Sequence, residues 1–257
     1  MTVAATFVLG LVTGVLSGMF GVGGAVISTP GIRALGAPPL DAVGTTLPAM
    51  LPSALSGSLR YRREGLLSGR IIGWVAGVGA AIAVATSFAA HAVPGDGHWL
   101  MVATAVIILY TAVKVAQSGD RDLAALAHGT PEWRTEPWRL GVCGAGAGAM
   151  SGLLGLGGGT VLVPAFLGWL RMPIKATVAN SLACVGLLAV PSTIAHWYLG
   201  DIDWAYALPL AIAVAPGARL GAHLAITASD RTLRLVVASG LAVIAVVYAA
   251  RELMEIY

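Results

Sequence analysis

Apolar runs recur along the whole chain, and each is separated from the next by a polar break that is mostly short. Many have the length of about 20 residues that an α-helix needs to cross a hydrocarbon core about 30 Å thick. The eight runs are residues 3–35, 40–59, 71–92, 99–116, 140–170, 176–199, 204–226 and 233–250. Only 11% of the residues are charged, whereas an ordinary soluble domain has about 25%. The sequence therefore predicts an all-α polytopic membrane protein.

Other classes of protein are excluded by the same patterns. Residues 100–113 and 233–250 are apolar all round, whereas the strands of a membrane barrel alternate over about ten residues. The net charge of +3 comes from residues in the polar breaks, so we expect no nucleic-acid partner. Cys143 and Cys184 lie in apolar runs without a CxxC motif, which predicts buried thiols. We predict no metal site and no cofactor.

The chain is an internal duplication. When the two halves are aligned with Gly10 on Gly144, eight identical residues coincide, namely Gly10, Gly14, Ser17, Gly18, Gly21, Gly23, Gly24 and Pro30 on Gly144, Gly148, Ser151, Gly152, Gly155, Gly157, Gly158 and Pro164. Moving the alignment by one further position then pairs Pro38 with Pro173 and residues 43–47 with 178–182. We therefore divide the chain into a first repeat (1–116), a cytoplasmic linker (117–138) and a second repeat (139–257).

The first run of each repeat is too long for one crossing. Residues 3–35 would extend about 50 Å as a helix at 1.5 Å per residue, so we expect a Gly-tipped hairpin, re-entrant or broken, followed by three transmembrane helices. Basic residues, which favour cytoplasmic loops, support this topology. It places twelve on one side (Arg60, Arg62, Arg63, Arg70, Lys114, Arg121, Arg134, Arg139, Arg171, Lys175, Arg231, Arg234) and only Arg33 and Arg251 on the other. Three crossings per half make the repeats inverted.

The glycine-rich turns of the two hairpins are the candidate binding site. Bare backbone N–H groups at a helix N-terminus bind anions, and discontinuous helices of inverted-repeat transporters use this property near the midplane of the bilayer. The alternative is that the glycines only permit close helix packing. The candidate residues at the turns are Ser17, Gly18, Gly21, Gly23, Gly24, Ser151, Gly152, Gly155, Gly157 and Gly158.

A resemblance to a known family rests on these motifs. Residues 17–24 and 151–159, each followed by the matched segment 43–47 or 178–182, together with residues 216–222 (PGARLGA), resemble the TauE/SafE family of sulfite and organosulfur anion transporters. The resemblance implies a carrier in a bacterial-type inner membrane, driven by an ion gradient, for sulfite, sulfoacetate or related small anions. One departure is Ala25, which stands where the second copy has Gly159.

Further candidates lie outside the turns. Thr45, Thr46, Asn180 and Ser181 occupy matched positions after the hairpins and offer uncharged hydrogen-bond donors, although bonding between helices is an equal alternative. Intramembrane charge is a functional hypothesis by default. Arg219 is therefore a candidate for attracting the anion, or its long side chain reaches the membrane surface.

Two histidines receive different interpretations. His223 lies one helical turn beyond Arg219 and is a candidate for coupling transport to protons, although a structural role is the stronger alternative. His196 and Trp197 end an apolar run and are expected to be interfacial anchors.

Three functions remain open: a secondary carrier of small sulfur-containing anions, an anion channel, and an intramembrane enzyme. The chain lacks HExxH, GxSxG and Walker A motifs, so we expect neither an enzyme nor an ATP-driven pump. The expected partners are the lipid bilayer and a small anion. A coupling proton or sodium ion and a homo-oligomer are left open.

Overall fold

The computed structural model describes residues 2–90, 98–117 and 136–256. These residues form ten α-helices and no strand, so the predicted all-α fold is confirmed. The helices are α1 (Thr2–Phe20), α2 (Ala25–Ala34), α3 (Pro39–Arg63), α4 (Gly69–Ala90), α5 (His98–Gln117), α7 (Pro137–Leu154), α8 (Gly159–Gly168), α9 (Ile174–Leu199), α10 (Trp204–Thr227) and α11 (Asp230–Ile256). The predicted linker, residues 117–138, lies mostly outside the described residues.

The first apolar run of each half is broken into two helices, as predicted. Residues 21–24 separate α1 from α2, and residues 155–158 separate α7 from α8. The second arm turns back along the first. Their closeness is seen at Gly31 in α2, where an added Cβ atom would lie 2.5 Å from Cδ2 of Leu9 in α1. Residues 21–24 and 155–158 are all buried, so the turn between the arms lies inside the helical bundle.

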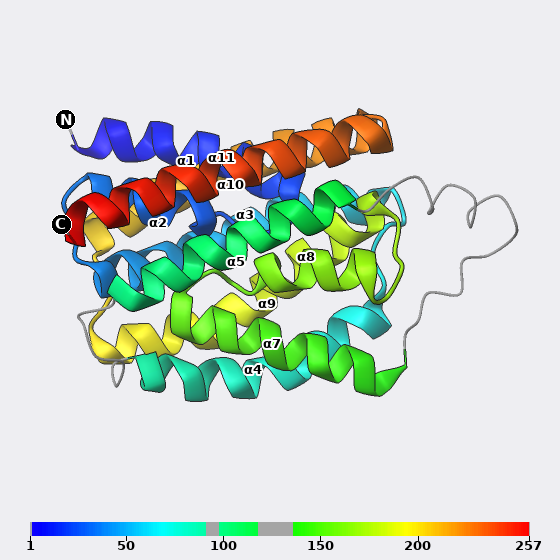
Figure 1. Ribbon diagram of the computed structural model, residues 1–257, viewed down its shortest axis with the longest axis horizontal. Helices are drawn as coiled ribbons and strands as arrows, with labels where there is room; N and C mark the ends of the chain where they lie inside the picture. The colour runs from blue at the N-terminus through cyan, green and yellow to red at the C-terminus, as the bar shows by residue number, and fades with distance from the viewer. Residues whose placement is uncertain (1, 91–97, 118–135, 257) are drawn as a thin grey trace, which may run out of the picture.

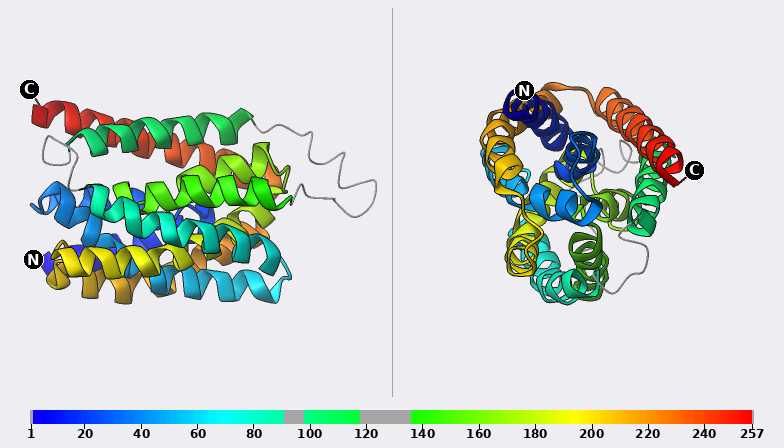
Figure 2. Two further views of the ribbon diagram at one scale, coloured as in Figure 1. Left: turned by 90° about the horizontal axis from the view of Figure 1, so that it is seen from below. Right: turned by 90° about the vertical axis from the view of Figure 1, so that its left-hand side faces the viewer.

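Helices of the first half pack on helices of the second (Figures 1 and 2). Helix α1 lies along α10, α7 along α4, α5 along α11 and α3 along α9. Glycines allow the closest of these approaches: a Cβ atom added to Gly14 would overlap the backbone oxygen of Val214, and one added to Gly148 would overlap that of Gly79. Small residues commonly have this role between membrane helices, so part of the glycine motif serves packing.

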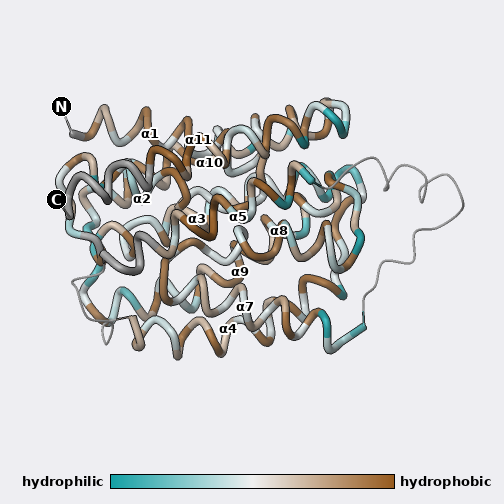
Figure 3. The backbone as a smooth tube through the Cα atoms, in the orientation of Figure 1, coloured by the Kyte–Doolittle hydropathy of each residue, from teal (hydrophilic) through white to brown (hydrophobic). Residues whose placement is uncertain are grey.

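The outer surface of the bundle is apolar. Side chains such as Val8, Ile212 and Val246 are about six-tenths exposed, and hydrophilic segments lie mainly at the two ends of the bundle (Figure 3). Among the described helices, four are long and apolar enough to cross a membrane, namely Val3–Phe20, Gly69–Ala90, Ile174–Leu199 and Trp204–Thr227. The chain is a multi-pass membrane protein.

One end of the bundle collects the turns that carry most of the basic residues. The α3–α4, α8–α9 and α10–α11 turns lie together at the end of the bundle where α5 ends and α7 begins (right in Figure 1). Hydrogen bonds join them, since Asn180 Nδ2 donates to the Leu66 oxygen at 2.9 Å and Lys175 Nζ donates to the Ile226 oxygen at 2.8 Å. We call this the linker end. Arg121 and Arg134 lie outside the described residues, and the orientation in the membrane stays a prediction.

Candidate functional site

The two hairpin turns require glycine for conformational reasons. Gly21 and Gly23 in the first turn, and Gly155, Gly157 and Gly158 in the second, have φ between +62° and +79°. Residues with a Cβ rarely adopt these values, whereas glycine adopts them at little cost. The sequence motif therefore specifies two sharp breaks at matched positions. Gly24, which precedes α2, has a helical φ of −68°.

The two turns lie against each other in the centre of the molecule. A Cβ atom added to Gly159 would overlap the Cα atom of Val22 in the opposite turn. Cβ atoms added to Gly23 and Gly157 would lie 2.8 and 2.7 Å from the same atom, Cγ1 of Val185 in α9. Val22 and Val185 are buried. The point of contact is thus enclosed, and it brings together glycines from matched positions of the two repeats.

Helices α2 and α8 both begin at this contact. Within the part of the chain that the structure describes, the N–H groups of residues 22–26 and 156–160 donate no hydrogen bond. Such groups carry a partial positive charge of about half an elementary unit at each helix N-terminus. Two helix N-termini that meet in an apolar interior favour a negatively charged ligand between them.

The first arm of each hairpin is anchored by matched hydrogen bonds. Ser17 Oγ lies 2.9 Å from Ser53 Oγ, and in the second half Ser151 Oγ lies 2.9 Å from Ser192 Oγ. These two candidate serines therefore join α1 to α3 and α7 to α9.

The carbonyl groups of Gly18 and Gly152 are also bound by side chains. Tyr61 donates its hydroxyl proton to the Gly18 oxygen at 2.6 Å, and His196 Nε2 lies 3.3 Å from the Gly152 oxygen. Sequence reasoning missed both partners. The alignment that pairs Pro38 with Pro173 also pairs Tyr61 with His196, and this signal was available in the sequence.

The four polar residues after the hairpins are buried and hydrogen-bonded. Thr45 Oγ1 accepts from the Asp203 N–H at 2.9 Å, and Ser181 donates to the Gly21 oxygen of the first turn at 2.6 Å. Thr46 Oγ1 donates to the Val43 oxygen at 3.0 Å and lies 3.3 Å from Thr29 Oγ1. Among the hydrogen bonds of the described residues, Ser181 is the one member of this set that bonds to a glycine turn.

Asn180 uses both ends of its amide. Its Oδ1 accepts from the Ser68 N–H at 2.8 Å, and its Nδ2 donates to the oxygens of Leu66 (2.9 Å) and Ala176 (2.8 Å). It therefore holds the α3–α4 turn against α9 at the linker end.

Replacing Asn180 by aspartate tests this role. A carboxylate cannot donate to the carbonyls of Leu66 and Ala176, and a buried acceptor left unsatisfied costs about 1–3 kcal/mol. We expect Asn180→Asp to lower the thermal unfolding midpoint of the purified protein by several degrees. The control Ser239→Ala, which removes an exposed hydroxyl bonded within its own helix, is expected to leave the midpoint unchanged. Equal midpoints for both variants would contradict the role.

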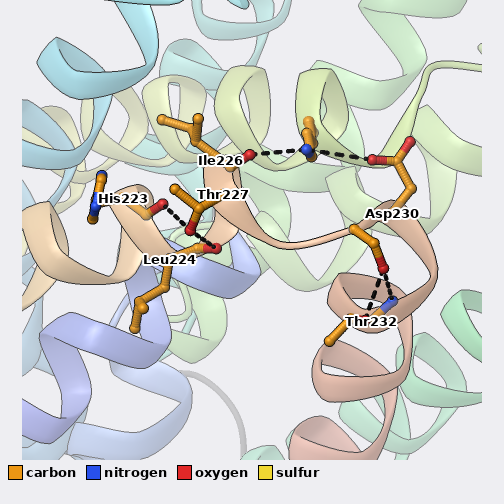
Figure 4. A network of polar contacts seen from close by, with 8 residues as sticks. His223, Leu224, Ile226, Thr227, Asp230 and Thr232 are labelled. Atoms are coloured by element: carbon orange, nitrogen blue, oxygen red, sulfur yellow. Dashed lines mark hydrogen bonds and ion pairs between the residues drawn. The ribbon is translucent and has the colours of Figure 1, made fainter.

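Arg219 and His223 lie apart from the turns. Both are exposed on α10, and Arg60 Nη2 lies 3.5 Å from His223 Nδ1. His223 belongs to the polar network of the linker end (Figure 4), in which Thr227 donates to the His223 oxygen at 3.0 Å. In the same network Lys175 Nζ lies 3.6 Å from Asp230 Oδ1. The structure therefore brings neither candidate to the glycines.

His196 differs from its expected place. Trp197 is 64% exposed, as an interfacial anchor should be, whereas His196 is completely buried, so that expectation was wrong for His196. Its Nδ1 lies 2.6 Å from Oδ2 of Asp201, whose side chain is also buried. The chain turns at Gly200, which ends α9 with φ +86°, and this turn places Asp201 beside His196. The Asp201 N–H donates to the His196 oxygen at 3.0 Å.

The two cysteines are free and buried, as predicted. They lie in the cluster of apolar side chains between α4, α7, α8 and α9. They take no part in the glycine turns.

Comparison with known proteins places this arrangement in a family. The sequence model described as "Sulfite exporter TauE/SafE" matches residues 6–248, which covers both hairpins and nearly the whole chain. The chain belongs to the TauE/SafE family. The resemblance seen in the glycine motifs is therefore confirmed, and this TauE/SafE family member is a membrane transporter.

Curated relatives of this TauE/SafE protein agree. The probable membrane transporter protein YunE of Bacillus subtilis (strain 168) is 25% identical over 84% of this chain and 85% of its own length. The probable membrane transporter protein MJ0441 of Methanocaldococcus jannaschii is 26% identical over 92% of this chain and 91% of its own. YjnA of B. subtilis, also named a probable membrane transporter protein, is 27% identical over 90% and 93%. No solved structure matches the chain.

Proposed function

We propose that this protein is a secondary transporter that moves small sulfur-containing anions, such as sulfite or sulfoacetate, across a bacterial-type inner membrane. The anion binds between the two glycine turns, and an ion gradient drives transport. The observation that carries the proposal is the contact of Val22 with Gly159. This contact brings the unpaired N–H groups of residues 22–26 next to those of residues 156–160. The description of the family as sulfite exporters supports the class of substrate.

The packing of the two halves supports an inverted-repeat mechanism. Helix α1 and its counterpart α7 run in opposite directions in Figure 1, and each packs on a helix of the other half. We propose that one hairpin enters the membrane from each side. Movement of one half against the other then exposes the turns to the two sides alternately.

A carrier is favoured over a channel because the contact between the turns is closed. Val22, Met50, Leu156 and Val185 surround it and are buried, so an anion enters the space between the two turns only after these side chains move. Such a requirement produces saturable transport with alternating access. An anion channel remains the second candidate, because the same turns would attract anions in an open state.

Uptake of labelled sulfite into proteoliposomes tests the proposal. We expect saturable uptake that depends on an imposed ion gradient, and loss of uptake in Gly157→Val, whose side chain would meet Val185 and Met50. Conductance in single-channel steps would show that the protein is an anion channel and not a carrier. Chemical conversion of sulfite without vesicles would replace it by an enzyme, and absence of all three activities for sulfite and sulfoacetate would contradict the proposal.

A further inference from the structure

A cavity of about 700 Å³ lies beside the second hairpin, between α5, α7 and α8. Its volume is within the range of about 300–1,000 Å³ that is typical of small-molecule sites. Ile107, Tyr110 and Lys114 line it from one face of α5, and α8 lines it from Thr160 to Gly168. The cavity therefore follows α8 from the helix N-terminus, at the glycine turn, to the helix C-terminus at the linker end.

The inner end of the cavity holds an unsatisfied hydroxyl. Thr160 is completely buried, and within the described residues its Oγ1 has no hydrogen-bond partner. Its backbone N–H is one of the unpaired groups at the start of α8, while its carbonyl oxygen accepts from Thr111 Oγ1 at 2.6 Å. A buried hydroxyl without a partner is unfavourable, so Thr160 offers two donors to a ligand in the cavity.

A positively charged side chain, Lys114, lies at the outer end of the cavity. Lys114 lies in the last turn of α5 and is exposed. Its Nζ lies 5.6 Å from the ring centroid of Tyr110, and it forms no ion pair with a residue that the structure describes. The neighbouring cation Arg139 differs, because Glu136 Oε2 lies 3.0 Å from its Nε. Lys114 is thus available to a negatively charged solute.

We infer that this cavity is the passage through which the transported anion moves between the linker end and the glycine turns. Lys114 attracts the anion at the mouth, Thr160 donates to it at the inner end, and the apolar walls accept the short carbon chain of an organosulfonate. This inference rests on the proposed function and adds the route that the anion follows to the glycine turns.

The positions of the polar groups select a small anion over a lipid. A lipid in the cavity would place its phosphate at Lys114 and its acyl chains inside, so the hydroxyl of Thr160 would stay unpaired. A small organosulfonate moves along the cavity and can bind each group in turn.

The hydroxyl donor of Thr160 belongs to the second half alone, because the residue aligned with Thr160 in the first repeat is Val26.

Kinetics of Lys114→Gln test the mouth of the passage. We expect the KM for sulfoacetate supplied at the linker end to rise about tenfold at low ionic strength, because a charged cleft raises the local concentration of its substrate. High salt should reduce this difference, and kcat should not change. The matched control Arg231→Gln removes an exposed cation near the same end of the bundle and should leave KM unchanged. An unchanged KM in Lys114→Gln, or an equal rise in the control, would overturn the inference.

Thiol labelling tests the inner end without a transport assay. In Thr160→Cys we expect an anionic methanethiosulfonate reagent to label the protein, and sulfoacetate to slow labelling. The native cysteines are buried, so the unsubstituted protein supplies the background. No labelling above this background, or protection by vesicles of phosphatidylglycerol but not by sulfoacetate, would overturn the inference.

The two proposals fail in different ways. If Gly157→Val loses transport while Lys114→Gln and Thr160→Cys behave like the unsubstituted protein, the anion takes another route and only the passage is overturned. If the unsubstituted protein transports no sulfur-containing anion and sulfoacetate does not slow labelling of Thr160→Cys, both the proposed function and the passage are overturned.

Discussion

Gly159→Ala is expected to reduce sulfite transport by about 10- to 100-fold while the protein still inserts and folds. The new methyl group would overlap Val22 Cα and lie 2.6 Å from the Val22 carbonyl carbon. These are backbone atoms of the opposite turn, so a change of rotamer cannot relieve the contact. Overpacking of this kind costs about 1–3 kcal/mol, and each 1.4 kcal/mol corresponds to about tenfold in affinity.

The matched control is Gly141→Ala in α7. No atom lies within 4 Å of the position of its new Cβ, and alanine favours a helix over glycine by up to about 1 kcal/mol. Its transport and thermal midpoint should equal or exceed those of the unsubstituted protein. Measured uptake rates in proteoliposomes with equal amounts of inserted protein decide the matter, and full activity of Gly159→Ala would remove the contact between the turns from the mechanism.

Asp201→Ala is expected to cause a large loss of stability. Asp201 Oδ2 lies 2.6 Å from His196 Nδ1, and the imidazole also lies 3.3 Å from the Gly152 oxygen at the end of α7. The imidazole is completely buried, so removal of the carboxyl group takes away a buried hydrogen-bond partner of Nδ1. Removing one member of a buried pair costs about 3–5 kcal/mol. At roughly 2–4 °C per kcal/mol, the thermal midpoint should fall by on the order of 10 °C.

Asp203→Ala is the control for this prediction, since it changes the same loop. Within the described residues, its carboxylate accepts one hydrogen bond, from the Ala205 N–H at the start of α10, at 2.8 Å. Loss of such a cap costs about 1 kcal/mol. Thermal unfolding followed by fluorescence should therefore rank Asp201→Ala well below Asp203→Ala. Equal midpoints for the two variants would mean that the His196–Asp201 pair does not hold the second hairpin.

The sequence predicted the helices and their breaks because both follow from local chemistry. An apolar run as long as residues 3–35 cannot cross once as an upright helix, and glycines repeated at the same spacing mark the turns. The positive φ of Gly23 and Gly157 agrees with this reasoning. The duplication also pointed to the matched polar positions after the hairpins, and these are buried where α3 and α9 begin.

Other features depend on contacts between distant segments, which local patterns do not specify. His196 and Trp197 are neighbours in an apolar run, and only the packing of α9 against α7 decides that one is buried and the other exposed. Lys114 and Thr160 are far apart in the sequence and belong to different repeats. Their shared cavity appears only when α5 lies beside α8. Arg219 attracted attention as an isolated charge, yet it lies on an exposed face of α10.

The most direct measurement is a structure of the protein with bound selenite, a heavier analogue of sulfite whose selenium atom scatters anomalously. We predict an anomalous peak between the two glycine turns, within hydrogen-bond distance of N–H groups from both residues 22–26 and residues 156–160. A peak at only one turn, or only at surface cations while the turns stay in contact through Val22 and Gly159, would contradict anion binding between the opposed helix N-termini.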